Sequence, residues 1–502
     1  MKCHPYGKLL PTLMFLAIIY NLMLVCSYLN VPLHDDETFR QTQTALTSYW
    51  LPITHQWLGY QTPVLGYPWT IPFEFPLFQW SVALIHACTP FSLDTTGRFL
   101  SISFLYLTLI PLFLLIKNIG YSPRLFYVTG ILLLSSPVII TWAHTFLIES
   151  TVVFLCMCYL AAIAHYLKTN DCYSLIIATF MGVLAIISKV TTFTPAAFFA
   201  LGLVLVNWYR EDIYRFNTKI LIKYLFIMLI IFIIPLIAEI IWTHYCDLLK
   251  AGNDLGANLT AHNLIHFNFG TLSQRYSKEF WLLIMNNSLA IVCTFPLVLL
   301  LLVITKLRTS CWPWLCLISY LSGPLVFSNL FFQSHYWYEV AIYLILAAAI
   351  ILNFVFILKP KWALSLLLIS LLGQVIMLNP IKFINNHAQS WTDKNYLIGT
   401  FIKDNTPKNS FILVYGADWS SAITYYAERK SLSDPQWTGW QERIKNLKHY
   451  QGGLPLSAVV LCHEYSANLF AQTQVLIRPL VQEFQQRSIS GCIVYFRTTV
   501  TN

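Results

Sequence analysis

The chain has 502 residues, of which 57% are hydrophobic and 11% are charged, and its formal net charge is +9. Its mean hydropathy of +0.60 excludes an ordinary soluble enzyme and indicates a polytopic membrane protein. Because the positive charge is concentrated in short loops between apolar runs, it reflects membrane topology and gives no reason to expect nucleic acid as a partner.

Apolar runs of about 17 to 22 residues recur along the chain, and this length crosses a bilayer core of about 30 Å. The first run resembles a secretory signal, but it lacks a small-x-small cleavage site and further runs follow it, so we interpret it as a retained span. We expect about 11 transmembrane helices, near 9–29, 98–116, 124–142, 147–167, 173–190, 192–208, 220–241, 281–304, 312–331, 339–358 and 362–378.

The Lys and Arg residues indicate the orientation of these spans. If the N-terminus is cytoplasmic, the inner segments carry most of the Lys and Arg residues up to residue 378, whereas nearly all Asp and Glu residues in the same part of the chain fall on the outer side. We therefore expect a cytoplasmic N-terminus. An odd number of spans then places residues 379–502 outside the cytoplasm.

The first outer loop, at 30–97, contains two unusual segments. FPLFQWSVALIHAC at 75–88 is apolar but short for a span, and we interpret it as a helix at the membrane interface, with Trp80 and His86 as anchors. The proline-rich segment at 60–76 predicts irregular backbone, which near membrane depth requires cover by protein or a water-filled cavity.

The tail alternates strand-like and helix-like stretches. FILVYG at 411–416, AVVLC at 458–462 and CIVYFR at 492–497 favour strands, and WSSAITYYAERK at 419–430 favours a helix. This pattern predicts a small extracytoplasmic α/β domain.

We expect two domains: a transmembrane domain at 1–380, which includes outer loop 30–97, and the soluble domain at 381–502. Cys462 and Cys492 lie in two of the strand-like runs, where an oxidising compartment permits a disulfide. The sequence leaves this pairing open, because it does not supply the geometry. The other cysteines are interpreted as small apolar core residues.

Asp35, Asp36 and Glu37 follow the first span directly. Three acids held together repel one another, so at least one becomes a candidate general base. Arg40 lies one helical turn beyond Asp36, which favours a charge network. A solvated acidic loop is the simpler explanation.

Three more ionisable residues are expected at the same outer face. Glu149 lies near the outer end of the fourth span, Lys189 lies in the turn between the fifth and sixth, and His335 lies at the outer end of the ninth. Ionisable residues at membrane depth are costly and by default face a cavity or a partner. The simpler explanations are a helix-start carboxylate, a snorkelling lysine and an interfacial aromatic belt.

Together these residues suit group transfer from a lipid-linked phosphate. A carboxylate base would deprotonate an acceptor hydroxyl or amine, and the cations would bind the departing phosphate. Since the phosphate leaves as a stabilised anion, no general acid is required.

The motifs resemble those of the GT-C superfamily of polyprenyl-phosphate-dependent glycosyltransferases, in the branch of protein O-mannosyltransferases and lipid A aminoarabinose transferases. DETFRQ at 36–41 resembles the Asp-Glu pair that this family carries after its first span, and PFEFPLFQW resembles its Glu-x-Pro-Pro-Leu stretch. ISKVTTFTPAA resembles its lysine-containing turn, and SHYWYE resembles its tyrosine-rich stretch that meets the donor phosphate.

The resemblance implies a GT-C fold and a set of acidic residues. Asp36 would be the catalytic base, with Glu37 as its supporting acid and Asp35 as an additional carboxylate. Glu74, in the proline stretch, and Glu149, where the family has a second acid, would be further supporting acids.

The resemblance also implies the ligands. The family lysine of the proline stretch is Phe75 here, so we expect Arg40, Lys189, His335 and Tyr338 to share the binding of the donor phosphate. The donor would be a sugar on polyprenyl phosphate, in bacteria undecaprenyl phosphate. The acceptor would be a lipid, glycan or protein at the outer face of a bacterial inner membrane.

Two other classes of membrane protein share some of these features. A transporter or lipid-linked-sugar flippase would place ionisable groups near the bilayer midplane in broken, repeated helices. An O-antigen polymerase or ligase would rely on arginines of its outer loops. The chain has no DxD motif and the resembling mannosyltransferases work without metal, yet several outer carboxylates could hold a divalent ion, so metal dependence stays open.

Overall fold

The computed structural model describes residues 8–34, 37–212, 217–304, 310–435, 437, 439–462 and 467–498. Their chain forms two compact units, which we call unit 1 (Met1–Leu29, Arg98–Thr243 and Leu264–Ile384) and unit 2 (Asn30–Gly97, His244–Asn263 and Asn385–Asn502), each in its described part. Loop 30–97, which we assigned to the transmembrane domain, groups with the tail in unit 2. The expected division at residue 380 stays a prediction.

Unit 1 is helical. Its helices in chain order are α1 (Leu9–Cys26), α4 (Leu93–Asn118), α5 (Pro123–Ser135), α6 (Pro137–Ala143), α7 (Glu149–Thr169), α8 (Cys172–Ser188), α9 (Val190–Asp212), α10 (Thr218–Met228), η1 (Leu229–Ile233), α11 (Ile234–Lys250), α12 (Ile265–Phe269), α13 (Leu272–Tyr276), α14 (Lys278–Ile291), α15 (Phe295–Ile304), α16 (Cys311–Val326), η4 (Leu330–Phe332), α17 (Tyr336–Leu358), α18 (Pro360–Leu378) and α19 (Pro380–Asn386).

Seven helices in the described chain are long and apolar enough to cross a membrane: α1, α4, α7, α9, the continuous α10–α11 helix, α17 and the α18–α19 helix. Two further pairs pass the same test but are bent, α5 with α6 by 65° and α14 with α15 by 99°. With the shorter apolar helices α8 and α16, these elements account for every predicted apolar run. The number that crosses the membrane stays a prediction.

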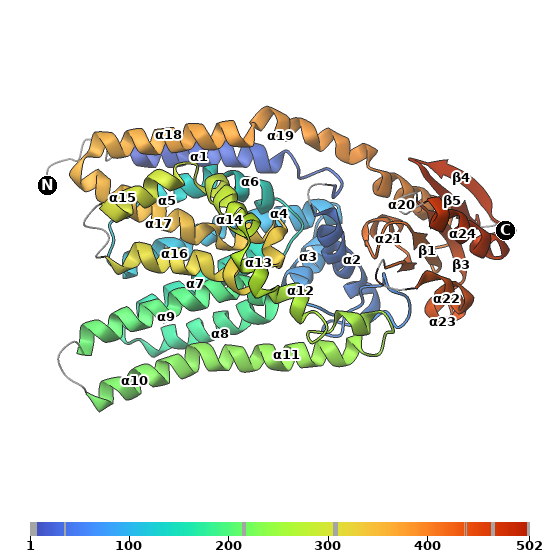
Figure 1. Ribbon diagram of the computed structural model, residues 1–502, viewed down its shortest axis with the longest axis horizontal. Helices are drawn as coiled ribbons and strands as arrows, with labels where there is room; N and C mark the ends of the chain where they lie inside the picture. The colour runs from blue at the N-terminus through green and yellow to red at the C-terminus, as the bar shows by residue number, and fades with distance from the viewer. Residues whose placement is uncertain are drawn as a thin grey trace. The chain divides into compact units, whose positions relative to one another are not determined.

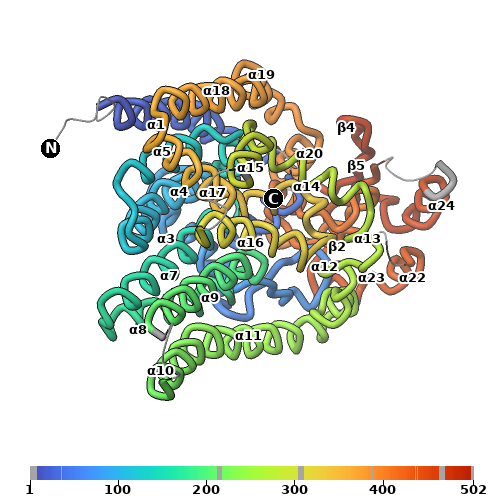
Figure 2. Tube along the Cα trace, turned by 60° about the vertical axis from the view of Figure 1, so that its left-hand side comes forward, coloured from blue at the N-terminus to red at the C-terminus, as the bar shows by residue number. Residues whose placement is uncertain are grey.

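Helix α17 is the most enclosed of the seven, since 83% of its apolar window is buried, against 17% for the α18–α19 helix. A helix that is apolar on all sides belongs in the interior of a helical protein, whereas α18 exposes apolar side chains as a lipid-facing helix does. Helices α5, α9, α16 and α18 pack around α17 (Figure 1). Figure 2 shows, as Figure 1 does, that α18 runs beside α1.

Unit 2 begins with the helices of loop 30–97, α2 (Thr38–Thr54) and α3 (Leu77–Cys88). Helix α3 coincides with the helix predicted at 75–88, and its place at a membrane interface stays a prediction. Residues 55–76 between the two helices have irregular backbone, as the prolines indicated.

The tail folds as a five-stranded sheet with helices, which confirms the expected α/β fold. Unit 2 also contains the short helix η2 (Gly256–Leu259), in the segment His244–Asn263. The elements of the tail are η5 (His387–Thr392), α20 (Lys394–Asn405), β1 (Phe411–Tyr415), α21 (Ala422–Ala427), β2 (Lys430–Ser433), α22 (Trp440–Lys445), α23 (Leu447–Gln451), β3 (Leu456–Leu461), α24 (Ala467–Ile477), η6 (Arg478–Leu480), β4 (Gln485–Ile489) and β5 (Cys492–Phe496).

The strand order is β2-β1-β3-β5-β4. Strand β1 pairs in parallel with β2 and β3, whereas β5 pairs antiparallel with β3 and β4. Ile402 and Ile423, from α20 and α21, cover one face of the sheet by packing against Ile412, Val414 and Val460. Every residue of β1 is buried, as expected for a central parallel strand covered on both faces.

Loop 30–97 covers the free edge of this sheet at β2. The amide of Gly66 donates to the carbonyl of Ser431 at 2.9 Å, and the amide of Ser431 donates to the carbonyl of Pro63 at 3.0 Å. The amide of Ser433 donates to the carbonyl of Val64 at 2.8 Å. Because an uncovered edge strand is prone to pair with other chains, this loop protects the sheet.

A disulfide joins Cys462, after β3, to Cys492 in β5. It answers the question of pairing that the sequence left open and links the neighbouring strands β3 and β5.

Candidate active site

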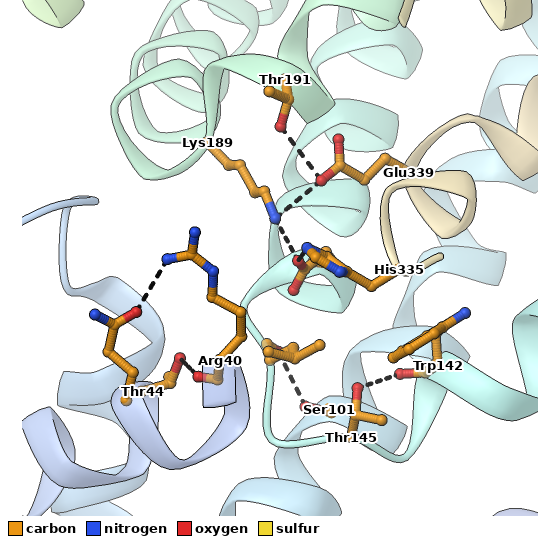
Figure 3. A network of polar contacts seen from close by, with 12 residues as sticks. Arg40, Thr44, Ser101, Trp142, Thr145, Lys189, Thr191, His335 and Glu339 are labelled. Carbon is orange, nitrogen blue, oxygen red and sulfur yellow. Dashed lines mark hydrogen bonds and ion pairs between the residues drawn. The ribbon is translucent and has the colours of Figure 1, made fainter. Parts of the chain in front are cut away.

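Elements α7, α17 and the α8–α9 junction bring charged side chains together around Lys189 (Figure 3). Lys189 is the single residue between α8 and α9, and its extended backbone (φ −165°, ψ 103°) interrupts the helical path. Its Nζ forms ion pairs with a carboxylate oxygen of Glu149 and, at 2.9 Å, with Oε1 of Glu339. One lysine therefore bridges two carboxylates.

Both carboxylates lie at helix starts. Glu149 is the first residue of α7, and Glu339 lies in the first turn of α17. The free amides and the dipole at a helix N-terminus favour a negative charge there. The Glu149 side chain is 6% exposed and that of Glu339 is fully buried, so the shared pairing with Lys189 is needed to offset their desolvation.

His335 and its aromatic neighbours pack beside these charges. His335 Nε2 lies 3.9 Å from Glu149 Oε1, and its ring centroid lies 4.2 Å from that of Tyr336 and 5.9 Å from that of Trp142. Lys189 Nζ lies 4.8 Å from the centroid of the Tyr336 ring, within cation–π distance. The structure thus brings together Glu149, Lys189 and His335, which we expected in one site.

Several buried polar atoms on these segments have no hydrogen-bond partner among the residues that the structure describes. Thr191 Oγ1 does donate to Glu339 Oε1, at 3.3 Å. Because buried polar atoms are normally paired, the atoms without a partner give this cluster free capacity to bind a polar ligand or water. In the described chain they are Oε2 of Glu149, Oε2 of Glu339 and the hydroxyl oxygens of Thr151, Ser188 and Thr192.

Tyr338 is buried on α17, next to Glu339 in sequence. Its hydroxyl shares a 2.9 Å hydrogen bond with Oγ of Ser150, the second residue of α7. A hydroxyl can donate and accept at the same time, so this bond leaves Tyr338 able to contact a further polar group.

Glu37 and Arg40 belong to unit 2, at the start of α2. Glu37 has a left-handed backbone (φ 62°), and its carbonyl accepts hydrogen bonds from the amides of Arg40 and Gln41 at 2.9 and 3.1 Å. Arg40 Nη1 donates to the neutral side chain of Gln43 at 3.1 Å, and the hydroxyl of Thr44 donates to the Arg40 carbonyl at 3.0 Å (Figure 3). A positive φ is uncommon for a residue with a Cβ and is typical of functional sites.

The remaining predicted acids are Asp35, Asp36 and Glu74. Asp35 and Asp36 lie outside the described residues. Glu74 is half-buried in the irregular segment of unit 2, and its carbonyl accepts a hydrogen bond from the Tyr60 hydroxyl at 2.9 Å. The roles of these three residues stay predictions.

Two buried charges of unit 1 were not among the predicted site residues. One is Glu339, although its position in the first turn of an apolar helix matches that of Glu149 and could have indicated it. The other is Arg98, which is fully buried, donates from Nη1 to the His144 carbonyl at 3.3 Å and lies 5.8 Å from the centroid of the Tyr28 ring.

Among the described residues, no group of three or more His, Cys, Asp or Glu side chains is arranged to hold a metal ion. Metal dependence therefore stays open, as the sequence left it.

The fold is similar to solved structures of membrane glycosyltransferases. ArnT from Cupriavidus metallidurans in the apo state matches with a TM-score of 0.63 at 12% identity, over 96% of this chain and 97% of that chain. The Archaeoglobus fulgidus oligosaccharyltransferase in the apo form matches with a TM-score of 0.56 at 12% identity, over 99% of this chain and 75% of that chain. Arabinofuranosyltransferase AftD from Mycobacteria matches with a TM-score of 0.50 at 11% identity, over 97% of this chain and 40% of that chain.

No family model and no curated protein matches the sequence. The structural likeness and the apolar helices together define an integral membrane protein with the GT-C fold, which confirms the expected fold class. Identity of 11 to 12% establishes the fold alone, so the reaction has to be argued from this chain's own residues.

Proposed function

We propose that the protein is an inverting glycosyltransferase. It moves a sugar from a polyprenyl-phosphate donor, in a bacterium undecaprenyl phosphate, to a lipid, glycan or protein acceptor at the outer face of the inner membrane. The observation that supports this proposal most is the buried cluster of Glu149, Lys189 and Glu339, with His335 beside it, within a GT-C fold.

Stability alone does not account for such a cluster. A charged side chain among membrane helices is costly, and a buried ion pair can often be replaced by apolar residues of similar volume with no loss of stability. Here two carboxylates are kept at the starts of α7 and α17 and a lysine is kept between α8 and α9, with carboxylate oxygens left for further contacts. This arrangement favours a role in binding or catalysis over a purely structural one.

In the proposed reaction, Asp36 takes the proton of an acceptor hydroxyl or amine. The freed electron pair forms a bond to the anomeric carbon of the donor sugar, and the bond from that carbon to the phosphate oxygen breaks on the opposite face. Polyprenyl phosphate leaves with the bonding electrons, so the anomeric configuration inverts. Asp35 and Glu37 strengthen the base, because neighbouring negative charges raise its affinity for the proton.

Arg40, Lys189, His335 and Tyr338 are the proposed contacts for the departing phosphate. Lys189 already bridges two carboxylates, which compensate its charge, whereas Arg40 donates to the neutral amide of Gln43. A guanidinium also matches the geometry of two phosphate oxygens. We therefore assign the principal phosphate contact to Arg40.

Glu149 and Glu74 are the proposed supporting acids. Glu149 acts by holding Lys189 in position, since the two side chains are directly paired.

The test is sugar transfer by membranes that contain the wild type or Asp36→Asn in equal amount, supplied with a pool of polyprenyl-phosphate sugars. Loss of a general base typically costs about 100-fold or more in rate, so Asp36→Asn should lose nearly all transfer. The matched control is Glu279→Gln, which changes an exposed acid of α14 and should transfer sugar normally.

Unchanged transfer by Asp36→Asn would move the base to Asp35 or Glu149. Movement of a lipid-linked sugar across the bilayer without any transfer would replace the proposal with a flippase.

A further inference from the structure

The carboxyl ends of β1, β2 and β3 meet at one edge of the sheet in unit 2, because β1 pairs in parallel with both neighbours. In the order β2-β1-β3, the chain leaves β1 toward one side to form β2 and later returns on the other side to form β3. Open α/β sheets bind ligands outside the carboxyl ends of their strands, where the strand order reverses. The fold therefore favours a ligand at this edge.

Four aromatic side chains gather at this edge, and we call them the aromatic platform: Phe39, Phe73, Trp419 and Trp437. Trp419 lies in the loop after β1 and Trp437 in the loop after β2. The centroid of the Trp419 ring lies 4.8 Å from that of Phe39, 5.6 Å from that of Trp437 and 6.3 Å from that of Phe73. Trp437 is 43% exposed and the other three are half-buried, so the platform keeps aromatic surface in contact with solvent.

Two carboxylates accompany the platform. Asp418 precedes Trp419 and has a left-handed backbone (φ 50°), and Asp434 follows β2 and pairs with Arg443 at 2.6 Å. Burial raises the pKa of Asp434 to about 6 against the effect of Arg443, and the negative charge of Asp418 adds to the rise. Carboxylates accept hydrogen bonds from hydroxyl groups and repel phosphates and other acids.

We propose that the aromatic platform is the acceptor site of the transferase and takes an uncharged sugar ring of a glycan. This inference rests on the proposed function and narrows its acceptor class. The C–H face of a pyranose is apolar and stacks on tryptophan, while its hydroxyls donate to the carboxylate of Asp418. A phosphate-bearing acceptor is disfavoured by the negative charge of Asp418, whereas the charge of Asp434 is compensated by Arg443.

The platform is joined to the start of α2, where the proposed catalytic acids lie. Phe39 is two residues from Glu37, and the hydroxyl of Ser421, two residues after Trp419, donates to the Phe39 carbonyl at 3.2 Å. Ser421 also shares a 2.9 Å hydrogen bond with the hydroxyl of Thr42. A sugar held on the platform is therefore positioned within the same unit as Glu37, and the platform residue Phe39 is two residues from Glu37 in the chain.

The test is binding of uncharged oligosaccharides to the full-length protein in detergent micelles, followed by saturation-transfer NMR. The probes are maltohexaose, mannohexaose and chitohexaose, with a peptide rich in Ser and Thr for comparison. At least one oligosaccharide should bind, and Trp437→Ala should weaken its binding by about tenfold, as expected for loss of one aromatic contact. Trp437→Phe should retain most of the binding, because it keeps an aromatic face.

The matched control is Trp57→Ala, which removes another exposed tryptophan of unit 2, 38% exposed, and should bind as the wild type does. The proposal is overturned if no oligosaccharide binds the wild type, if Trp437→Ala binds equally well, or if the peptide alone binds in a Trp437-dependent manner.

Consumption of a polyprenyl-phosphate sugar by the same preparation separates this inference from the proposed function. Donor consumption without Trp437-dependent sugar binding overturns the platform alone. Trp437-dependent sugar binding without donor consumption retains a glycan site but overturns its role as an acceptor site, together with the transferase.

Discussion

Lys189 is the residue on which the buried charge cluster depends, because it is paired with both Glu149 and Glu339. Lys189→Met would leave two carboxylates buried without their shared partner. Removing one partner of a buried ion pair typically costs about 3–5 kcal/mol, so we expect a loss of that order in the free energy of unfolding. Thermal unfolding in detergent micelles at fixed protein concentration measures it.

The control for this change is Lys223→Met. Lys223 pairs with Glu211 at 3.3 Å, but the two side chains are 33% and 36% exposed, and such surface pairs contribute about 1 kcal/mol or less. If Lys189→Met and Lys223→Met lowered the free energy of unfolding by the same small amount, the cluster would not be important for the stability of the fold.

Asp393 is the N-cap residue of α20 and has three hydrogen-bond partners. Its carboxylate accepts from the amides of Asn395 and Tyr396 at 2.9 and 3.0 Å, and its other oxygen lies 2.9 Å from Nδ1 of His34. Burial raises the pKa of Asp393, but the hydrogen bond from His34 and those from the two amides outweigh it and hold the pKa below its ordinary value.

Asp393→Asn keeps a helix-capping side chain but removes the charge. Because the pKa is lowered on folding, the unfolded state binds more protons in the acid range. The stabilisation is therefore fully present above the ordinary Asp pKa of about 3.9 and is lost as the pH falls through the folded-state pKa. We expect the wild type to unfold at a higher temperature than Asp393→Asn at about pH 5, and the difference to shrink below about pH 4. A difference that is independent of pH would contradict this account.

At the scale of single residues, Glu149, Lys189 and His335 could be grouped from the sequence because scarce charges stood at the outer ends of apolar runs. Glu339 was missed, since the aromatic residues before it are also explained by an interfacial belt. The lysine was expected to face a phosphate, and its pairing with two carboxylates could not be predicted, because it depends on how α7 and α17 pack.

At the scale of single elements, hydropathy predicts where an apolar run lies but does not predict where a helix bends. The run at 124–142 is predominantly apolar, yet α5 and α6 meet at 65°. The reason is local: Ser136 precedes Pro137, which disfavours the helical conformation, and Ser136 has an extended backbone (φ −63°, ψ 126°). Strands β2 and β4 were missed because most of their residues are polar, so neither has the apolar run that marks the other strands.

Asn253 connects two segments of unit 2, His244–Asn263 and loop 30–97. Its Nδ2 donates to the carbonyls of Gly66 and Pro68 at 3.0 and 2.9 Å, and its Oδ1 accepts from the amides of Leu255 and Gly256 at 2.9 and 2.7 Å. The side chain is 1% exposed. It therefore holds the segment that covers the edge of the sheet.

Asn253→Ala removes these bonds and leaves buried backbone groups unsatisfied, which typically costs about 1–3 kcal/mol. We expect faster hydrogen–deuterium exchange of the amides at 63–66 and in β2, because the edge pairing loosens. Asn258→Ala, five residues further along the same loop and exposed, should leave this exchange unchanged. Unaltered exchange in Asn253→Ala would show that the loop is held by other contacts.

For the whole molecule, the distribution of charge predicts the orientation of the chain in the membrane. Alkaline phosphatase is active only outside the cytoplasm, so fusions after residues 171 and 359 should be inactive in a bacterial host. Fusions after residues 262 and 392 should be active. An inactive fusion after residue 392 would contradict the odd number of spans and the outer position of the tail.

The helical architecture of the whole molecule could be predicted because crossing a bilayer demands long apolar runs, a requirement visible in the sequence itself. The grouping of loop 30–97 with the tail could not be predicted. It depends on pairing between residues such as Gly66 and Ser431, which are far apart in the chain and have no local sequence signal.

The central claim is that the chain transfers a sugar from a polyprenyl phosphate with inversion. In the most direct measurement, purified protein in liposomes is given one polyprenyl-phosphate sugar and a glycan acceptor. The amount of polyprenyl phosphate released and the anomeric configuration of the product are then determined. We predict release of one polyprenyl phosphate per sugar transferred and an inverted linkage. A product with retained configuration, or a donor that crosses the bilayer without being consumed, would contradict the account.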